Sequence, residues 1–145
     1  MAQASSSTDI PASPNEVWQL IGGFNSLPDW LPYILKSELS EGGRVRHLAT
    51  FTGETIIERL ERFDNTARTY SYSILKAPFK ITNYLATIRV EAKDGGNSSR
   101  TEWSGIFTPN GISDVEASKL FQGIFDDGLE ALAARYKSKK QQSVS

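Results

Sequence analysis

A carboxylate within an apolar strand pattern is the first feature of this sequence that could do chemistry. Residues 55–63 read TIIERLERF, in which apolar and β-branched residues follow the two-residue rhythm of a strand. Ile56, Glu58 and Leu60 share one face of this strand, while the opposite face carries two charges and is expected to be wetter. Because burying an unpaired charge is very costly, Glu58 needs a partner, a proton or a water-filled space.

The preceding strand, predicted over residues 44–51, offers a partner for Glu58. The short TGE stretch that follows it turns the chain back, so the two strands form a hairpin. A loop centred on Gly53 places Arg46 beside Glu58. A strictly two-residue loop would bring His47 alongside instead, because a one-residue slip flips the face of a strand. We favour the first register, and it stays open whether the two charged groups form a structural ion pair or face a ligand.

Few other residues suggest catalysis or a bound cofactor. His47 is the only histidine, and neither a nucleophile nor an orienting partner accompanies it, so we expect an exposed or structural role. The absence of cysteine excludes disulfides and thiolate metal sites, and a single histidine argues against zinc and di-iron sites. The Gly-Gly pairs at 22–23 and 42–43 do not have the pattern of a phosphate loop. We expect no cofactor and no metal.

Three aromatic residues on predicted strands could serve either packing or binding. Tyr72, Tyr84 and Trp103 each have apolar neighbours, as ordinary core residues do. Aromatic rings with one polar tip also line pockets for small apolar ligands that carry a few hydroxyl groups. The residues alone leave core packing and cavity lining equally open.

The length and composition indicate a single domain over residues 1–145. With 39% apolar and 23% charged residues, the chain is an ordinary globular protein that is large enough to bury a core. Its formal net charge of −1 indicates no binding to nucleic acid or to an anionic membrane. No apolar run reaches the roughly 18 residues of a membrane span, and residues 1–8 do not resemble a signal peptide. We expect a cytoplasmic protein, and its oligomeric state stays open.

Helix signals stand on both sides of a long run of predicted strands. Ser13 is a good N-cap and Pro14 suits the first helical position, so a short helix begins there and a Gly-Gly pair ends it. The aromatic, proline-punctuated stretch 24–33 predicts a second short helix. Apolar residues at three- and four-residue spacing predict a long helix that begins near Ser113. A polar, frayed tail is expected from about residue 137.

Turn-forming residues divide the rest of the chain into strands at short spacing. The expected strands cover residues 3–10, 34–40, 44–51, 55–63, 68–75, 81–92 and 99–108. Sequential hairpins form an antiparallel sheet, and a long amphipathic helix can cover one face of it. The predicted fold class is therefore α+β: a curved antiparallel sheet of about seven strands around the long C-terminal helix, with two short helices after the first strand.

The element order and several motifs resemble a known superfamily over nearly the whole chain. The opening IPASPNEVW at 10–18, followed by FNSLPDWLP at 24–32, is similar to the bacterial polyketide cyclase/dehydrase-like proteins. These belong to the START and birch-pollen-allergen-like superfamily, also known as SRPBCC, whose fold is the helix grip. The resemblance implies a single START-like domain with a sizeable hydrophobic cavity between the sheet and the long helix.

The middle of the chain is also similar to the plant abscisic-acid receptors. The matching stretches are VRHL at 45–48, IIERLERFD at 56–64 and the pair Asn83-Tyr84. Two departures argue against a hormone receptor. Leu31 stands where the receptors have the lysine that grips the hormone carboxylate, and the receptors' gate loop is shortened to TGE.

The resemblance implies which residues face the cavity. In the receptor-like members, the glutamate that matches Glu58 and the tyrosine that matches Tyr84 line it. By position, the expected ligand-binding residues are Trp30, Tyr33, Arg46, Leu48, Thr50, Ile56, Glu58, Tyr72, Ile74, Tyr84, Ala86, Trp103, Leu120, Ile124 and Gly128.

Three functions follow as hypotheses. The first is a ligand-binding or carrier protein for a small hydrophobic or aromatic, polyketide-like molecule, with Glu58 and Arg46 as polar anchors. The second is a polyketide cyclase/dehydrase-type enzyme in which Glu58 is the catalytic acid or base, because an apolar pocket raises the pKa of a carboxyl group. The third is a structural module with a filled core. The sequence leaves the choice among them, and the ligand, open.

Overall fold

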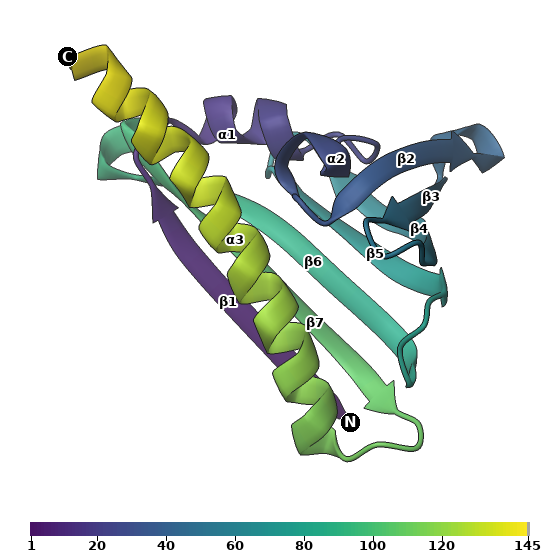
Figure 1. The fold of residues 1–145 in the computed structure, drawn as a ribbon. Helices are drawn as coiled ribbons and strands as arrows, with labels where there is room; N and C mark the ends of the chain where they lie inside the picture. The colour runs from purple at the N-terminus through teal and green to yellow at the C-terminus, as the bar shows by residue number, and fades with distance from the viewer. Residues whose placement is uncertain (145) are drawn as a thin grey trace.

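The computed structural model describes residues 1–144, with side chains described through residue 137. The chain begins with β1 (Ala2–Ile10), α1 (Pro14–Ile21) and α2 (Leu27–Trp30). Six strands follow, with one short 3-10 turn each after β2 and β6: β2 (Ile34–Ser40), β3 (Val45–Thr50), β4 (Thr55–Asp64), β5 (Thr69–Lys76), β6 (Ile81–Lys93) and β7 (Ser98–Pro109). The last element is the long helix α3 (Asp114–Val144) (Figure 1).

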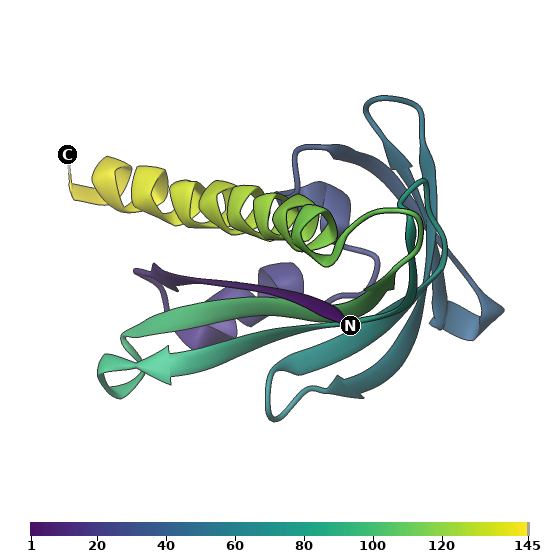
Figure 2. The ribbon, with the colours of Figure 1, turned by 90° about the horizontal axis from the view of Figure 1, so that it is seen from below.

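All seven strands form one antiparallel sheet in the order β1-β7-β6-β5-β4-β3-β2. The sheet curves, and α3 runs along β1 and β7 on its concave side (Figures 1 and 2). The short helix α1 contacts β6 and β7, and α2 contacts β2 and α3. This arrangement confirms the predicted α+β helix-grip fold, including the two short helices after β1. Within the part of the chain that the structure describes, no helix is long and apolar enough to cross a bilayer.

The capping residues predicted for the helices are confirmed. The side chain of Ser13 accepts a hydrogen bond from the Glu16 backbone N–H at 3.2 Å, which fixes the start of α1. Ser113 does the same for the Glu116 backbone N–H at 3.1 Å and fixes the start of α3. We expected a frayed tail from about residue 137. This expectation is wrong, because the backbone stays helical to Val144. The lysines and glutamines of that segment favour a helix, and no glycine or proline stops it.

The hairpin of β3 and β4 has the register that pairs the two charged residues. Arg46 lies directly opposite Glu58, and His47 lies opposite Ile57 on the outer face. The loop turns at Gly53, whose φ of 86° is costly for residues with a side chain. The prediction that placed Arg46, and not His47, beside Glu58 is confirmed.

Small residues allow α3 to approach the sheet closely. A Cβ atom added to Gly128 would lie 2.7 Å from Cζ3 of Trp103 and 2.9 Å from Cδ2 of Leu31. A Cβ atom on Gly105 of β7 would lie 3.3 Å from Cζ of Phe125. The two glycines therefore set the spacing between helix and sheet, and with it the volume that is left between them.

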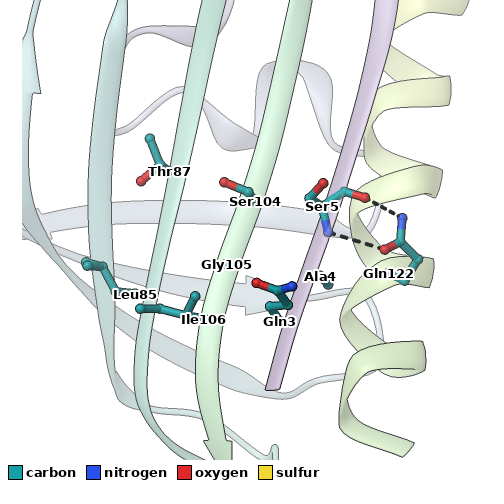
Figure 3. Close-up of a pocket in the computed structure, with 9 residues that line it drawn as sticks. All are labelled: Gln3, Ala4, Ser5, Leu85, Thr87, Ser104, Gly105, Ile106 and Gln122. Carbon is teal, nitrogen blue, oxygen red and sulfur yellow. Dashed lines mark hydrogen bonds between the residues drawn. The ribbon is translucent and has the colours of Figure 1, made fainter. Parts of the chain in front are cut away.

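A side chain of α3 also holds the edge strand β1. Oε1 of Gln122 accepts a hydrogen bond from the Ser5 backbone N–H at 3.2 Å, and Nε2 donates to the Ser5 carbonyl at 2.7 Å (Figure 3). The amide of Gln122 thus contacts the backbone of β1 as a neighbouring strand would.

Candidate functional site

A cavity of about 50 Å³ lies between the sheet and α3. Its lining is almost entirely apolar or aromatic, with one carboxylate. The lining residues are Leu27, Leu31, Tyr33, Ile34, Leu48, Ile56, Glu58, Tyr72, Ile74, Phe79, Tyr84, Trp103, Phe121, Ile124 and Phe125. A volume of 50 Å³ is well below the roughly 300–1,000 Å³ of typical ligand sites, so the lining is packed nearly closed.

Most residues that were expected to face a ligand do line this cavity. They come from the concave faces of β3 to β7, from the residue before β2 and from α3. They are Tyr33, Leu48, Ile56, Glu58, Tyr72, Ile74, Tyr84, Trp103 and Ile124. That these side chains contact a ligand stays a prediction.

The structure places the remaining expected residues outside the lining, each for a visible reason. Arg46 lies behind Glu58, as described below. Trp30 packs on Trp103, with ring centroids 5.8 Å apart. The side chain of Thr50 accepts a hydrogen bond from the Glu54 backbone N–H at 3.1 Å and so stabilises the hairpin loop. Two small residues pack between elements instead: Gly128 seats α3, and Ala86 lies beside Gly105 under Phe125.

Leu120 was expected to face the cavity, but the structure places it outward. Its side chain is 39% exposed, whereas Phe121 is 2% exposed and lines the cavity. The buried residues of α3 follow the spacing of Ala117, Phe121 and Phe125, so Leu120 lies about 100° around the helix from this stripe.

Several lining residues were missed when the site was predicted from the sequence. Phe121 and Phe125 lie four residues apart on the apolar face of α3, and that spacing was a usable signal. Leu27, Leu31 and Ile34 lie in and just after α2, where only the tertiary fold turns them inward. Phe79 follows a proline in the connection between β5 and β6, and no periodic pattern marks it.

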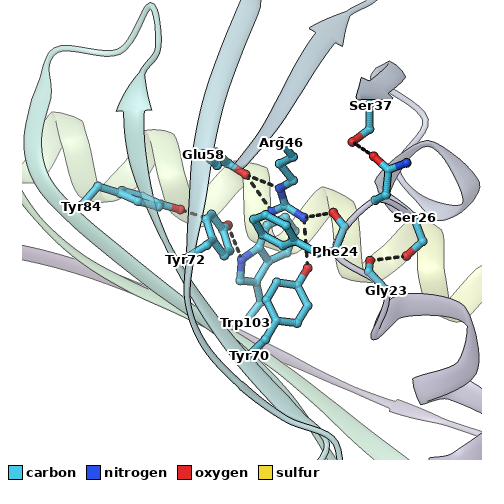
Figure 4. Close-up of polar contacts among 11 residues, drawn as sticks. Gly23, Phe24, Ser26, Ser37, Arg46, Glu58, Tyr70, Tyr72, Tyr84 and Trp103 are labelled. Carbon is cyan, nitrogen blue, oxygen red and sulfur yellow. Dashed lines mark hydrogen bonds and ion pairs between the residues drawn. The ribbon is translucent and has the colours of Figure 1, made fainter. Parts of the chain in front are cut away.

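Arg46 is buried and fully engaged by its surroundings (Figure 4). Its Nε and Nη2 contact Oε1 of Glu58 at 2.8 and 2.7 Å. Its Nη1 donates to the Phe24 carbonyl at 2.9 Å and to the Tyr70 hydroxyl at 3.4 Å. The rings of Phe24 and Tyr72 lie 4.2 and 4.8 Å from the guanidinium carbon. Every nitrogen of this cation therefore has a partner, and the cation does not line the cavity.

Glu58 has one engaged oxygen and one that is left over. Both contacts from Arg46 go to Oε1, and among the residues with described side chains none hydrogen-bonds Oε2. Burial raises the pKa of Glu58 above its usual value, and the neighbouring Arg46 works in the opposite direction. Since Glu58 lines the cavity, it presents a carboxylate there whose proton affinity is increased.

Two tyrosines and a tryptophan form a hydrogen-bond chain beside Glu58 (Figure 4). The indole N–H of Trp103 donates to the Tyr72 hydroxyl at 3.0 Å, and the hydroxyls of Tyr72 and Tyr84 lie 3.4 Å apart. An indole only donates, so the Tyr72 proton is free to point to Tyr84. Burial, and second the charge of Glu58, raise the pKa of Tyr84, which keeps this hydroxyl protonated.

The wall of the cavity is thinnest where the lining residues are only half-buried. Tyr33, Ile74, Phe79 and Ile124 are partly exposed, whereas the other lining residues are buried. The ring of Phe79 packs edge-on against Phe121, with centroids 5.1 Å apart. An opening to solvent would therefore form among these four residues.

A larger hollow of about 480 Å³ lies on the outer face of the sheet (Figure 3). Leu85, Thr87, Ser104 and Ile106 line it together with residues of β1 and Gln122. It is shallow and open, and no ionisable side chain lines it. Nor do three Asp, Glu or His side chains converge as metal ligands anywhere among the described residues. We take the cavity between the sheet and α3, with its apolar and aromatic lining and the single carboxylate of Glu58, as the candidate site.

The curved sheet with a cavity under its long helix is a helix-grip fold. A family model described as polyketide cyclase/dehydrase and lipid transport matches residues 1–137. The chain belongs to this family. None of the curated proteins matches the chain.

Several solved structures are similar to this chain. The protein XoxI from Bacillus cereus is 58% identical, with a TM-score of 0.94 over 97% of this chain and 99% of that one. A START superfamily protein from Mycobacterium smegmatis is 14% identical, with a TM-score of 0.76 over 95% and 99% of the two chains. The Zhui aromatase/cyclase from a Streptomyces species is 16% identical, with a TM-score of 0.73 over 93% of each. The last two show a shared fold.

Proposed function

We propose that this protein binds a small hydrophobic or aromatic molecule in the cavity between the sheet and α3, as a ligand-binding or carrier protein. The observation that carries this proposal is Glu58, which lines an aromatic cavity and whose Oε2 atom has no hydrogen-bond partner among the described residues. A core that served packing alone would gain from an apolar residue there. The family description, which includes lipid transport, supports the same function.

The small volume of the cavity sets a condition on this function. A ring system does not fit into about 50 Å³, so the half-buried lining residues have to move outward when a ligand enters. Phe79 is the best placed of these, since it lies in the connection between two strands, and its ring packs on Phe121.

The binding test uses the neutral fluorescent probe N-phenyl-1-naphthylamine with two matched variants. Ile74 lines the cavity, and its neighbour Leu75 is 50% exposed on the outer face. Ile74→Trp fills the cavity and should abolish the fluorescence increase, whereas Leu75→Trp should leave it unchanged. Equal binding by both variants, or no binding by the wild type, would contradict the proposal and favour a structural module with a filled core.

A cyclase/dehydrase-type reaction is the second candidate, and the raised pKa of Glu58 favours it. A carboxyl group with this property suits proton transfer to or from a polyketide-like substrate. Turnover of a poly-β-ketone substrate should then be lost in Glu58→Gln while affinity for the probe is retained. If Glu58→Gln changes neither quantity and lowers only thermal stability, Glu58 belongs to a structural ion pair.

A further inference from the structure

We propose that the cavity selects neutral ligands that carry a hydroxyl group and rejects carboxylates. This inference rests on the proposed function and concerns the chemistry of the ligand at its polar end. It follows from which hydrogen-bonding atoms of the cavity are engaged by the protein and which are not.

The cation of this site is not available to a ligand. Nε and Nη2 of Arg46 contact Glu58, Nη1 contacts the Phe24 carbonyl and the Tyr70 hydroxyl, and the side chain is 1% exposed. Arg46 is absent from the cavity lining, and no other Arg or Lys lines it. A carboxylate ligand would therefore leave water without gaining a cationic partner, which is very costly.

The polar atoms that do face the cavity suit a hydroxyl group. In its ion pair with Arg46, Glu58 is a carboxylate, and an ionised carboxylate only accepts hydrogen bonds, so a ligand group placed at Oε2 has to donate one. Tyr84 lines the same cavity, and when the Tyr72 hydroxyl donates to that of Tyr84, the proton of the Tyr84 hydroxyl is free to donate to a ligand. One ligand hydroxyl can donate to Glu58 and accept from Tyr84, whereas an anion would face the charge of Glu58.

The apolar remainder of the lining indicates what this hydroxyl is attached to. The rings of Trp103 and Phe125 lie 4.6 Å apart, and those of Tyr84 and Phe121 lie 5.1 Å apart. Aromatic side chains of this density favour a flat or alicyclic apolar body in the ligand. The ligand class is therefore a neutral ring system with at least one hydroxyl at its buried end.

The test compares naphthalene, 2-naphthol and 2-naphthoate by equilibrium dialysis against the wild-type protein at pH 7. We expect 2-naphthol to bind about ten-fold or more tightly than naphthalene, because a hydrogen bond to a charged group is gained. We expect 2-naphthoate to bind more weakly than either. If 2-naphthoate equals or exceeds 2-naphthol, or all three bind equally, this inference is overturned while the proposed function stands. If none of the three binds although N-phenyl-1-naphthylamine does, only this inference is overturned; if the probe does not bind either, both are overturned.

Two variants show whether Glu58 sets this preference. Glu58→Gln keeps an oxygen for Arg46 and turns the free position into an N–H donor, so the order of 2-naphthol and 2-naphthoate should reverse. Glu61→Gln changes a carboxylate of the same strand that faces outward and hydrogen-bonds Ser73, so it should keep the wild-type order. An unchanged order in a folded Glu58→Gln protein would contradict the assignment. The wild-type comparison is decisive if that variant does not fold.

Discussion

Arg46 and Glu58 depend on each other because the fold removes both from water. The guanidinium is 1% exposed and the glutamate 6% exposed, and nitrogen and oxygen atoms of the pair lie 2.7 Å apart. In such surroundings the cost of burying the charges is close to the gain from pairing them. The pair is therefore poor evidence for added stability, but breaking it leaves an isolated charge inside the protein.

Arg46→Met should lower the free energy of unfolding by about 3–5 kcal/mol, since Glu58 is left without its cation. The double variant Arg46→Met/Glu58→Leu should recover most of this loss, because neither charge remains. Urea unfolding of the wild type, both single variants and the double variant measures the coupling. Additive effects of the two substitutions would contradict the mutual dependence.

The stability that Glu58 contributes should depend on pH in a defined direction. Its pKa in the folded protein lies above the usual value of 4.5, because of burial. Below pH 4.5 the group is protonated in both states, and as the pH rises the unfolded chain loses its proton first. The free energy of unfolding should therefore fall through the interval between 4.5 and the folded-state pKa.

The measurement for this pH dependence is the difference in unfolding free energy between the wild type and Glu58→Gln from pH 4 to pH 8. The other titratable groups at the cavity do not interfere. Arg46 stays charged, and the pKa values of Tyr33, Tyr72 and Tyr84 are raised, chiefly by burial. A difference that grows in favour of the wild type as the pH rises would mean that Arg46 outweighs burial.

At the scale of elements, the spacing between α3 and the sheet decides how much space the cavity has. Gly128 lets the helix approach Trp103 and Leu31 to distances that a methyl group would not allow. The helix carries a second glycine, Gly123, which is exposed and has no atom within 4 Å of an added Cβ. Substituting alanine at each of these two positions therefore distinguishes the steric cost of an added methyl group from the gain in helix propensity.

Gly128→Ala should destabilise the protein by about 1–3 kcal/mol, because the added methyl group overpacks the contact with Trp103. Gly123→Ala should instead stabilise it by about 0.5–1 kcal/mol, since alanine is the better helix former. Thermal unfolding of the two variants makes the comparison. If both substitutions stabilise the protein, α3 is not held as closely to the sheet as its glycines indicate.

The connection between β5 and β6 should control entry into the cavity. Phe79→Ala removes a half-buried ring from the thin part of the wall, so N-phenyl-1-naphthylamine should associate several-fold faster in stopped-flow fluorescence. The loss of packing on Phe121 should cost about 1–3 kcal/mol of stability. Phe51→Ala is the control, because Phe51 is 66% exposed and does not line the cavity. Equal rates for the two variants would place the entrance elsewhere.

At the scale of the whole molecule, features that depend on neighbours in the sequence could be predicted, and features set by distant contacts could not. Strand alternation and the turn at Gly53 were sufficient to pair Arg46 with Glu58 in the correct register. The volume of the cavity was not predictable, because it depends on how closely Gly128 lets α3 approach. Phe79 was missed for the same reason, since only the folded chain brings it onto Phe121.

The two edge strands of the sheet, β1 and β2, are protected from pairing with another strand to different degrees. At the β1 edge, an incoming strand would first have to break the two hydrogen bonds from Gln122 to the Ser5 backbone and displace the helix that carries this side chain. At the β2 edge, the described side chains provide no such cover, and Leu35 and Leu39 are 64% and 45% exposed. Unpaired strand edges are where sheets extend into aggregates. If this protein aggregates by adding strands to its sheet, we therefore expect the addition at β2 and not at β1.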